Sequence, residues 1–170
     1  CGPPLPVKPP QTSDPPDEAG LAAARELIRT AHKPVVIAGA DVIRAGAIGE
    51  LLSLVENIGA AVLVNMNARG VLPESHPRWA GVILGLYSPD IIESEIMNQA
   101  DVVLLAGADA MMTHVPWKSG LPTCELVARP EYETLSLDPK VRVNGDLKAA
   151  LKSLSSQRQK GFSKDQIRTT

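Results

Sequence analysis

Aromatic residues, cysteines and net charge are all scarce in this sequence. Two tryptophans, two tyrosines and one phenylalanine are its only aromatic residues among 170, which leaves few rings on which nucleic-acid bases could stack. The formal net charge is −2, so the chain lacks the basic excess that nucleic-acid binding requires. Two cysteines are too few for a disulfide framework or a zinc site. The composition therefore argues against a nucleic-acid-binding protein and favours a reducing compartment.

Long hydrophobic runs are missing as well. The longest apolar stretches are far too short to cross a bilayer, and the proline-rich start lacks the apolar core of a signal peptide. We therefore expect a cytoplasmic protein that does not enter a membrane. Hydrophobic residues nevertheless make up 44% of the chain, enough for the core of one ordinary domain. Because the chain begins with Cys1 and not with methionine, we expect a processed protein or a piece of a longer one.

Both ends of the chain differ from its middle. Residues 1–16 contain seven of the fifteen prolines, which disfavour helices and central strands and predict an extended linker. Residues 157–170 are polar and mostly basic, without a sustained apolar stripe, and predict a linker to a missing domain. Residues 17–156 are then expected to form a single domain taken from the middle of a longer protein.

Within that domain, strand and helix patterns alternate. Apolar runs without polar alternation predict strands covered on both faces, at 34–38, 61–64, 80–84, 102–106, and near 125–128 and 141–143. Apolar residues at helical spacing predict helices over 21–31, 48–58, 88–99 and 147–154. Asp14 or Asp17 is expected to cap the first helix, and Asp146 the last. This alternation predicts an α/β fold, a three-layer Rossmann-like domain with a doubly wound parallel sheet of five to six strands.

One short sequence occurs twice, each time at the end of a predicted strand. Ala-Gly-Ala-Asp occupies 38–41 and again 106–109. In a doubly wound sheet these two strands lie side by side, and ligands sit outside their carboxyl ends. The crevice residues are then Gly39, Ala40, Asp41, Arg44, Gly107, Ala108 and Asp109. The alternative is that each Ala-Gly simply ends a buried strand where backbones approach closely. We expect the Cα atoms of Asp41 and Asp109 to lie within about 12 Å, roughly two strand spacings with allowance for loop divergence.

Asp41 argues against a bound dinucleotide. It stands where a dinucleotide turn has its second glycine, so it fills space and its charge repels phosphate. Arg44 either neutralises Asp41 or remains a solvated charge. If the two aspartates satisfy nearby helix amides in place of a ligand, the crevice is filled by the chain's own side chains.

Other reactive side chains have simpler explanations. Cys1 could be an N-terminal nucleophile or a processing boundary, and Cys124 could pair with His76 or His114 or be a small buried thiol. Met111 and Met112 could line a pocket or plug it. We predict no catalytic and no metal-binding residue in this chain.

Four stretches in order resemble the central domain of thiamine-diphosphate-dependent enzymes of the acetolactate synthase and benzoylformate decarboxylase group. They are "KPVVIAGADVIRAGA" (33–47), "ARGVLPESHPRWAG" (68–81), "NQADVVLLAGAD" (98–109) and "VRVNGDLKAALKSL" (141–154). The resemblance implies a structural and interface domain of a decarboxylase or carboligase acting on 2-oxo acids, inactive alone. It implies flanking domains that bind thiamine diphosphate and magnesium, in a parent that is a homodimer or homotetramer.

Some relatives bind FAD or ADP in this domain, so a free-standing nucleotide-binding module of the same fold is the alternative. The sequence departs from the flavin-binding pattern at three places, at Gly85-Leu86-Tyr87-Ser88, Gly107-Ala108-Asp109 and Val127-Ala128-Arg129. These departures predict that no FAD is bound. The Asn-Gly-Asp sequence at 144–146 has no paired asparagines downstream, so we expect it to cap a helix and not to bind a diphosphate.

Overall fold

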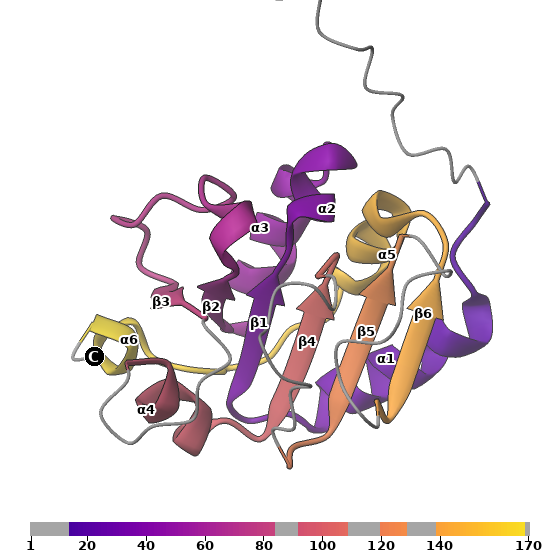
Figure 1. The fold of residues 1–170 in the computed structure, drawn as a ribbon. Helices are drawn as coiled ribbons and strands as arrows, with labels where there is room; N and C mark the ends of the chain where they lie inside the picture. The colour runs from indigo at the N-terminus through magenta and orange to yellow at the C-terminus, as the bar shows by residue number, and fades with distance from the viewer. Residues whose placement is uncertain (1–13, 84–91, 109–119, 129–138, 169–170) are drawn as a thin grey trace, which may run out of the picture.

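The computed structural model describes residues 14–83, 92–108, 120–128 and 139–168. Within these ranges the chain forms a six-stranded sheet in which every neighbouring pair of strands is parallel (Figure 1). The strands are β1 (Pro34–Ala38), β2 (Ala61–Val64), β3 (Trp79–Val82), β4 (Val102–Ala106), β5 (Thr123–Val127) and β6 (Val141–Asn144). None of the helices in the described ranges has both the length and the hydrophobicity needed to cross a bilayer.

The strand order places a topological switch point between β1 and β4. The order across the sheet is β3-β2-β1-β4-β5-β6. From β1 the chain moves outward through β2 and β3, then returns to β4 and moves the other way. The central pair stays in register from Pro34 opposite Val102 to Ala38 opposite Ala106. The predicted doubly wound sheet is confirmed, and so is the pairing of these two strands.

Helices cover both faces of the sheet, which confirms the three layers (Figure 1). One face carries α1 (Glu18–Thr30), α3 (Ile48–Ile58) and α5 (Leu147–Leu154), and the other carries α4 (Ile92–Gln99) and α6 (Lys164–Arg168). Because side chains alternate along a strand, Val36 and Leu104 enter the core on the α3 side, whereas Val35 and Ile37 enter it on the α4 side. Burial on both faces explains the unbroken apolar runs in the sequence.

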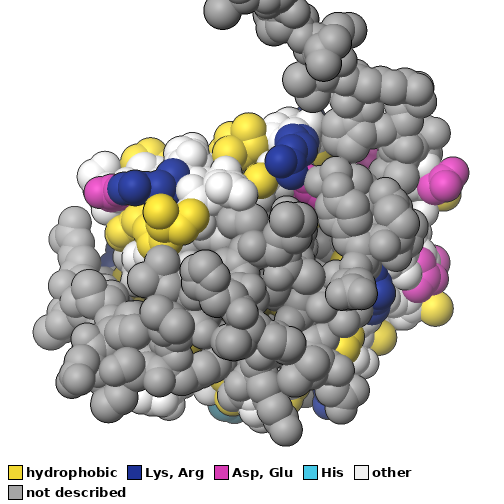
Figure 2. Space-filling model, in the orientation of Figure 1, with side chains coloured by type: hydrophobic (Ala, Val, Ile, Leu, Met, Phe, Trp, Pro, Cys, Tyr) yellow, Lys and Arg dark blue, Asp and Glu magenta, His cyan; other side chains and the backbone are white. Residues whose placement is uncertain are grey.

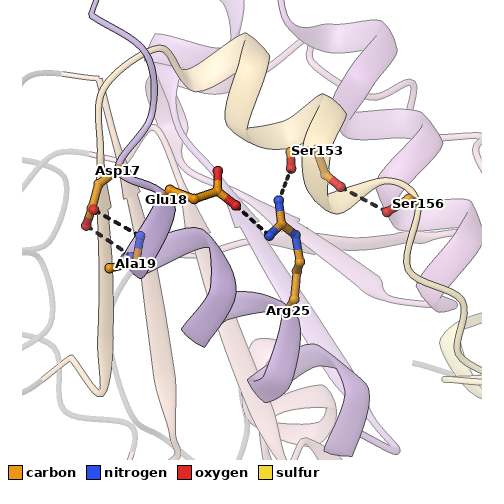
Figure 3. Close-up of polar contacts among 7 residues, drawn as sticks. Asp17, Glu18, Ala19, Arg25, Ser153 and Ser156 are labelled. Carbon is orange, nitrogen blue, oxygen red and sulfur yellow. Dashed lines mark hydrogen bonds and ion pairs between the residues drawn. The ribbon is translucent and has the colours of Figure 1, made fainter.

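The first helix begins where a side chain can satisfy its free amides. Asp17, and not Asp14, caps α1 by accepting hydrogen bonds from the backbone N–H groups of Ala19 at 3.2 Å and Gly20 at 3.1 Å (Figure 3). Arg25 then links α1 to α5, since its guanidinium donates to Glu18 Oε1 at 2.9 Å and to Ser153 Oγ at 2.6 Å.

Some boundaries differ from those expected. β3 ends at Val82, two residues before the predicted end at 84. β5 begins at Thr123, two residues before the predicted start at 125. A short helix, α2 (Ala40–Arg44), stands where the sequence indicated only a turn, because five residues are too few to show a helical period. It contacts the 3-10 helix η1 (Met66–Ala68) after β2. The predicted start of α4, at residue 88, lies outside the described residues.

Residues 157–168 pack against the domain, although the sequence predicted a polar linker there. Phe162 is 1% exposed and Ile167 is 3% exposed, and both belong to the core on the α4 side. Two apolar residues in a polar segment do not form a stripe, so the pattern did not indicate this packing. Continuation into a further domain stays a prediction. Residues 1–13, the rest of the predicted N-terminal linker, lie outside the described residues.

Candidate functional site

The two Ala-Gly-Ala-Asp turns meet at the switch point, as the sequence predicted. Ala38 ends β1 opposite Ala106 at the end of β4, so Gly39 and Gly107 follow at the same edge of the sheet. Main-chain hydrogen bonds continue past the strands. The N–H of Gly39 donates to the oxygen of Ala106 at 2.8 Å, and the N–H of Asp41 donates to the oxygen of Gly107 at 3.1 Å. The turns are therefore joined backbone to backbone.

Gly39 has no room for a side chain. A Cβ atom there would lie 2.1 Å from the carbonyl oxygen of Gly107 and 2.3 Å from the Cα of Ala108. Its φ of −106° is accessible to any residue, so the requirement for glycine is steric. In a dinucleotide-binding turn the corresponding space lets the backbone approach a pyrophosphate. Here that space is filled by the turn after β4.

Gly107 is required for both conformational and steric reasons. Its φ of +60° lies in the left-handed region that favours glycine. A Cβ atom would lie 2.8 Å from the Cδ2 of Leu147 in α5 and 3.0 Å from the Cβ of Asp41. Its N–H donates to the oxygen of Leu126 in β5 at 3.0 Å. This residue therefore packs the end of β4 against α2, α5 and β5 at once.

Asp41 and Arg44 form an ion pair inside the first helical turn after β1. Arg44 Nη1 donates to Asp41 Oδ1 at 2.7 Å, and the two side chains are 47% and 6% exposed. The sequence left open whether Arg44 neutralises Asp41 or stays solvated, and the structure shows the pair. A carboxylate in the first turn is also favoured by the helix dipole. Negative charge at this helix start is therefore already supplied by the chain.

Two of the amides at the start of α2 are bonded within the turns. Besides the bond from Asp41 to Gly107, the N–H of Val42 donates to the oxygen of Gly39 at 3.2 Å. A phosphate site at a helix start needs such N–H groups directed at the ligand. Ala108 packs against the core on the α4 side. Asp109 lies outside the described residues, so its predicted approach to Asp41 stays a prediction.

Cys124 is not placed to act as a nucleophile. It is fully buried in β5, and burial, together with the charge of Glu125, raises the pKa of its thiol to about 12. The thiol therefore stays protonated at neutral pH. His76 precedes β3, which three strands separate from β5. Its Nδ1 accepts from the N–H of Arg78 at 3.2 Å, and its Nε2 lies 3.5 Å from Glu56 Oε1, so it stabilises the turn.

The remaining candidates fall elsewhere. Cys1, Met111, Met112 and His114 lie outside the described residues. Within the described ranges, no group of three or more His, Cys, Asp or Glu side chains could hold a metal ion. Asp146 of the Asn-Gly-Asp sequence caps α5 by accepting from the N–H of Ala149 at 2.8 Å, as predicted.

Sequence reasoning missed several buried polar residues of the described ranges. Asn65 is 2% exposed, and neither Nδ2 nor Oδ1 has a hydrogen-bond partner among the described residues. Its N–H donates to the oxygen of Ala38 at 3.1 Å, which places it beside the paired turns. Glu125 and Arg78 are 2% and 7% exposed. A polar residue directly after an apolar strand was the signal that could have identified Asn65.

The fold and the paired turns define the class of this protein. It is a Rossmann-like domain in which the backbones that follow β1 and β4 pack directly against each other at the switch point. Residues 21–154 match the family model of the thiamine pyrophosphate enzyme central domain, and the chain belongs to this family. The resemblance seen in four stretches of the sequence is thereby confirmed.

Individual relatives agree with this assignment. The chain is 34% identical over 147 residues to sulfoacetaldehyde acetyltransferase of Alcaligenes xylosoxydans xylosoxydans, covering 81% of this chain and 24% of that enzyme. It is 33% identical over 91 residues to pyruvate decarboxylase of Neurospora crassa, covering 54% of this chain and 16% of that enzyme.

Solved structures show the same fold. An enzyme of Mycobacterium smegmatis assigned as thiamin diphosphate-dependent superposes with a TM-score of 0.72 at 26% identity, covering 88% of this chain and 29% of its own. Benzoylformate decarboxylase of Polynucleobacter necessarius superposes with a TM-score of 0.69 at 20% identity, covering 94% and 31%. The chain thus spans less than a third of the length of each of these four proteins.

Proposed function

We propose that this chain is the central structural and interface domain of a thiamine-diphosphate-dependent decarboxylase or carboligase that acts on 2-oxo acids. The observation that carries the proposal is the family match over residues 21–154. The family resemblance implies that flanking domains carry thiamine diphosphate and magnesium, so we expect both to be bound by other domains of the parent. The chain then has no catalytic residue of its own.

The role of the domain is to hold its neighbours in place. A switch point closed by backbone contacts at Gly39 and Gly107 is suited to a rigid scaffold. The neighbouring surface carries Ile43 and Met66, the exposed large hydrophobic residues of the described ranges, at 42% and 52% exposure. Figure 2 shows apolar side chains beside basic ones on this upper surface. Such a surface supports contact with a flanking domain of the parent, which we expect to be a cytoplasmic homodimer or homotetramer.

The alternative, a free-standing module that binds FAD or ADP, has less support. Asp41 already brings a carboxylate to the start of α2, and its own N–H donates to Gly107. A pyrophosphate at this place would meet the carboxylate of Asp41, and the N–H of Asp41 is already bonded. We therefore regard the crevice residues Gly39, Ala40, Asp41, Arg44, Gly107 and Ala108 as a vestigial site with a structural role, and we expect the same of Asp109.

Activity assays on two proteins test this function. The chain and its full-length parent are purified separately, and consumption of 2-oxo acids is measured with thiamine diphosphate and magnesium. We expect turnover by the parent that depends on thiamine diphosphate and none above background by the chain. Turnover by the rigorously purified chain, or a parent that is active without thiamine diphosphate, would contradict the proposal.

A thermal-shift experiment separates the two candidate functions. A ligand at ten times its Kd stabilises the folded state by about 1.4 kcal/mol, which is visible as a shift of several degrees. We expect neither FAD nor ADP at micromolar concentration to shift the melting temperature of the chain, and we expect purified protein to be colourless. A shift of that size would favour the nucleotide-binding alternative.

A further inference from the structure

The C-terminal residues 157–168, here termed the strap, are held on the domain at a few specific places. Figure 1 shows the strap running from α5 to α6, which lies beside β3 and α4. On the way it passes the carboxyl ends of α1 and α3. There the N–H of Gln159 donates to the oxygen of Asn57 at 3.0 Å, and its Nε2 donates to the oxygen of Arg29 at 2.8 Å.

Phe162 is the anchor of the strap. It is the one phenylalanine of the chain and is 1% exposed. Its N–H donates to the oxygen of Gly59 at 2.8 Å, and its carbonyl accepts from Arg78 Nη1 at 2.7 Å. Lys33 Nζ lies 4.6 Å from the centre of its ring, within the range of a cation–π contact. The ring and both main-chain groups of this residue are therefore bound by the domain.

Two glycines allow the strap to approach closely. Gly59 ends α3 with a φ of +65°, and Gly161 has a φ of +52°. A Cβ atom on Gly161 would lie 2.2 Å from the oxygen of Gly59, and one on Gly59 would lie 2.6 Å from the oxygen of Lys160. The backbones thus meet at a place that accepts no side chain from either partner. This fit places Phe162 in the core on the α4 side.

Most of the remaining strap is exposed. Ile167 is its other fully buried apolar side chain, while Arg158, Lys160 and residues 163–166 are exposed. Exposed polar contacts contribute little to stability because water competes for them. Segments with few buried apolar contacts open at lower free energy than core strands. The strap therefore has the character of an element that can detach while the sheet stays folded.

We propose that the strap is a latch that closes on Phe162 and opens as a unit, independently of the six-stranded sheet. The effect of the latch on a following domain rests on the proposed function, in which a further domain follows this one in the parent. When the latch is closed, the chain leaves the domain beside β3. When it is open, it frees twelve residues (157–168), which can extend over at most about 40 Å, so the following domain gains this length less the distance that the closed strap already spans.

Native-state hydrogen exchange on the wild-type chain tests the latch directly. Exchange is measured by NMR at low guanidinium concentrations, far below the unfolding midpoint. We expect the Phe162 amide to exchange through an opening at least tenfold more populated than the opening that exposes Val36 and Leu104 in the sheet. Identical exchange of all three amides would show that the strap belongs to the cooperative core. A Phe162 amide without protection would show that the latch does not close. Either result overturns the proposal.

A pair of variants identifies the anchor. Phe162→Ala should increase the population of the open strap at least tenfold further and leave sheet amides nearly unchanged. Lys164→Ala, an exposed change in the same segment, should alter strap exchange less than twofold. Equal loss of protection in strap and sheet for Phe162→Ala would contradict the proposal. If that variant does not fold, Phe162→Leu keeps apolar volume in the pocket and should give a smaller increase of the same kind.

The latch and the proposed function fail in distinguishable ways. All readouts above are amide exchange rates of this chain and involve no catalysis. An inactive parent would refute the proposed function and leave the exchange results unaffected. Uniform exchange of strap and sheet would refute the latch and leave the parent's activity unaffected.

Discussion

The carbonyl oxygen of Gly107 occupies the place that a side chain on Gly39 would need, 2.1 Å from its ideal Cβ position. These two residues end neighbouring strands in turns of the same sequence. Their contact packs two backbones tightly together at the switch point, the place outside which doubly wound sheets bind ligands. The stability of the domain should therefore depend on this contact more strongly than on the polar groups around it.

Gly39→Ala should lower the free energy of unfolding by about 1–3 kcal/mol, the usual cost of forcing extra volume into a packed site. The backbone at Gly39 is extended, so the cost comes from the clash with Gly107 and Ala108 alone. Gly49→Ala is the matched control, since a Cβ at Gly49 in α3 meets nothing within 4 Å. That change should be neutral or stabilise by up to about 1 kcal/mol. Unfolding in guanidinium measures the free energy of unfolding of both variants. Equal changes in the two variants would contradict a steric role for Gly39.

The ion pair between Asp41 and Arg44 should contribute modestly. Because the side chain of Arg44 is 47% exposed, water screens the interaction, and a double-mutant cycle should give a coupling of about 0.2–1 kcal/mol. Asp41→Ala should cost more than Arg44→Ala, since Asp41 is buried. The exposed pair Glu26 and Arg29 has the same i,i+3 spacing and serves as control, with a smaller coupling expected. A larger coupling in the control pair would contradict this account.

Cys124 should make the domain less stable at alkaline pH. Burial first, and the charge of Glu125 second, raise the pKa of its thiol from 9.0 to about 12. Above pH 9 the unfolded chain releases the thiol proton while the folded chain keeps it. Stability that is fully present below pH 9 is therefore lost, at about 1.4 kcal/mol per pH unit up to the folded-state pKa. Unfolding of the wild type and of Cys124→Ala between pH 8 and 10.5 checks this, because only the wild type should show this contribution. Parallel curves would rule it out.

Asn65→Leu should leave the free energy of unfolding unchanged or raise it by about 1 kcal/mol. The side-chain amide of Asn65 is buried and has no hydrogen-bond partner in the described part of the chain. An apolar side chain of similar size therefore removes a desolvation cost. Asn57 is the contrast, because its Nδ2 donates to the oxygen of Ser155 at 2.7 Å and its Oδ1 accepts from Arg158. Asn57→Leu should lower stability by about 1–3 kcal/mol. Comparable losses at the two sites, measured by urea unfolding, would count against this reasoning.

Much of the architecture was accessible from the sequence because its signals are local. β1, β2 and β4 have the predicted bounds, since each is an apolar run bounded by helix-ending or glycine-containing segments. Asp17 and Asp146 cap α1 and α5 at positions that the sequence indicated, because an N-cap acts on amides two or three residues away. The repeated Ala-Gly-Ala-Asp sequence predicted that two turns would meet.

Only the tertiary structure decided what happens where those elements meet. The sequence marked Gly39 as a ligand-binding or strand-ending glycine, but it did not indicate the close contact with Gly107, because that contact joins residues far apart in the chain. Phe162 is buried by Gly59, Arg78 and Lys33, none of which is near it in sequence. A periodic pattern reports which face of an element is apolar, but not which distant residue covers it. For that physical reason the sequence determined the layers of this domain, while the contact between Gly39 and Gly107 and the burial of the strap emerged only from the packing.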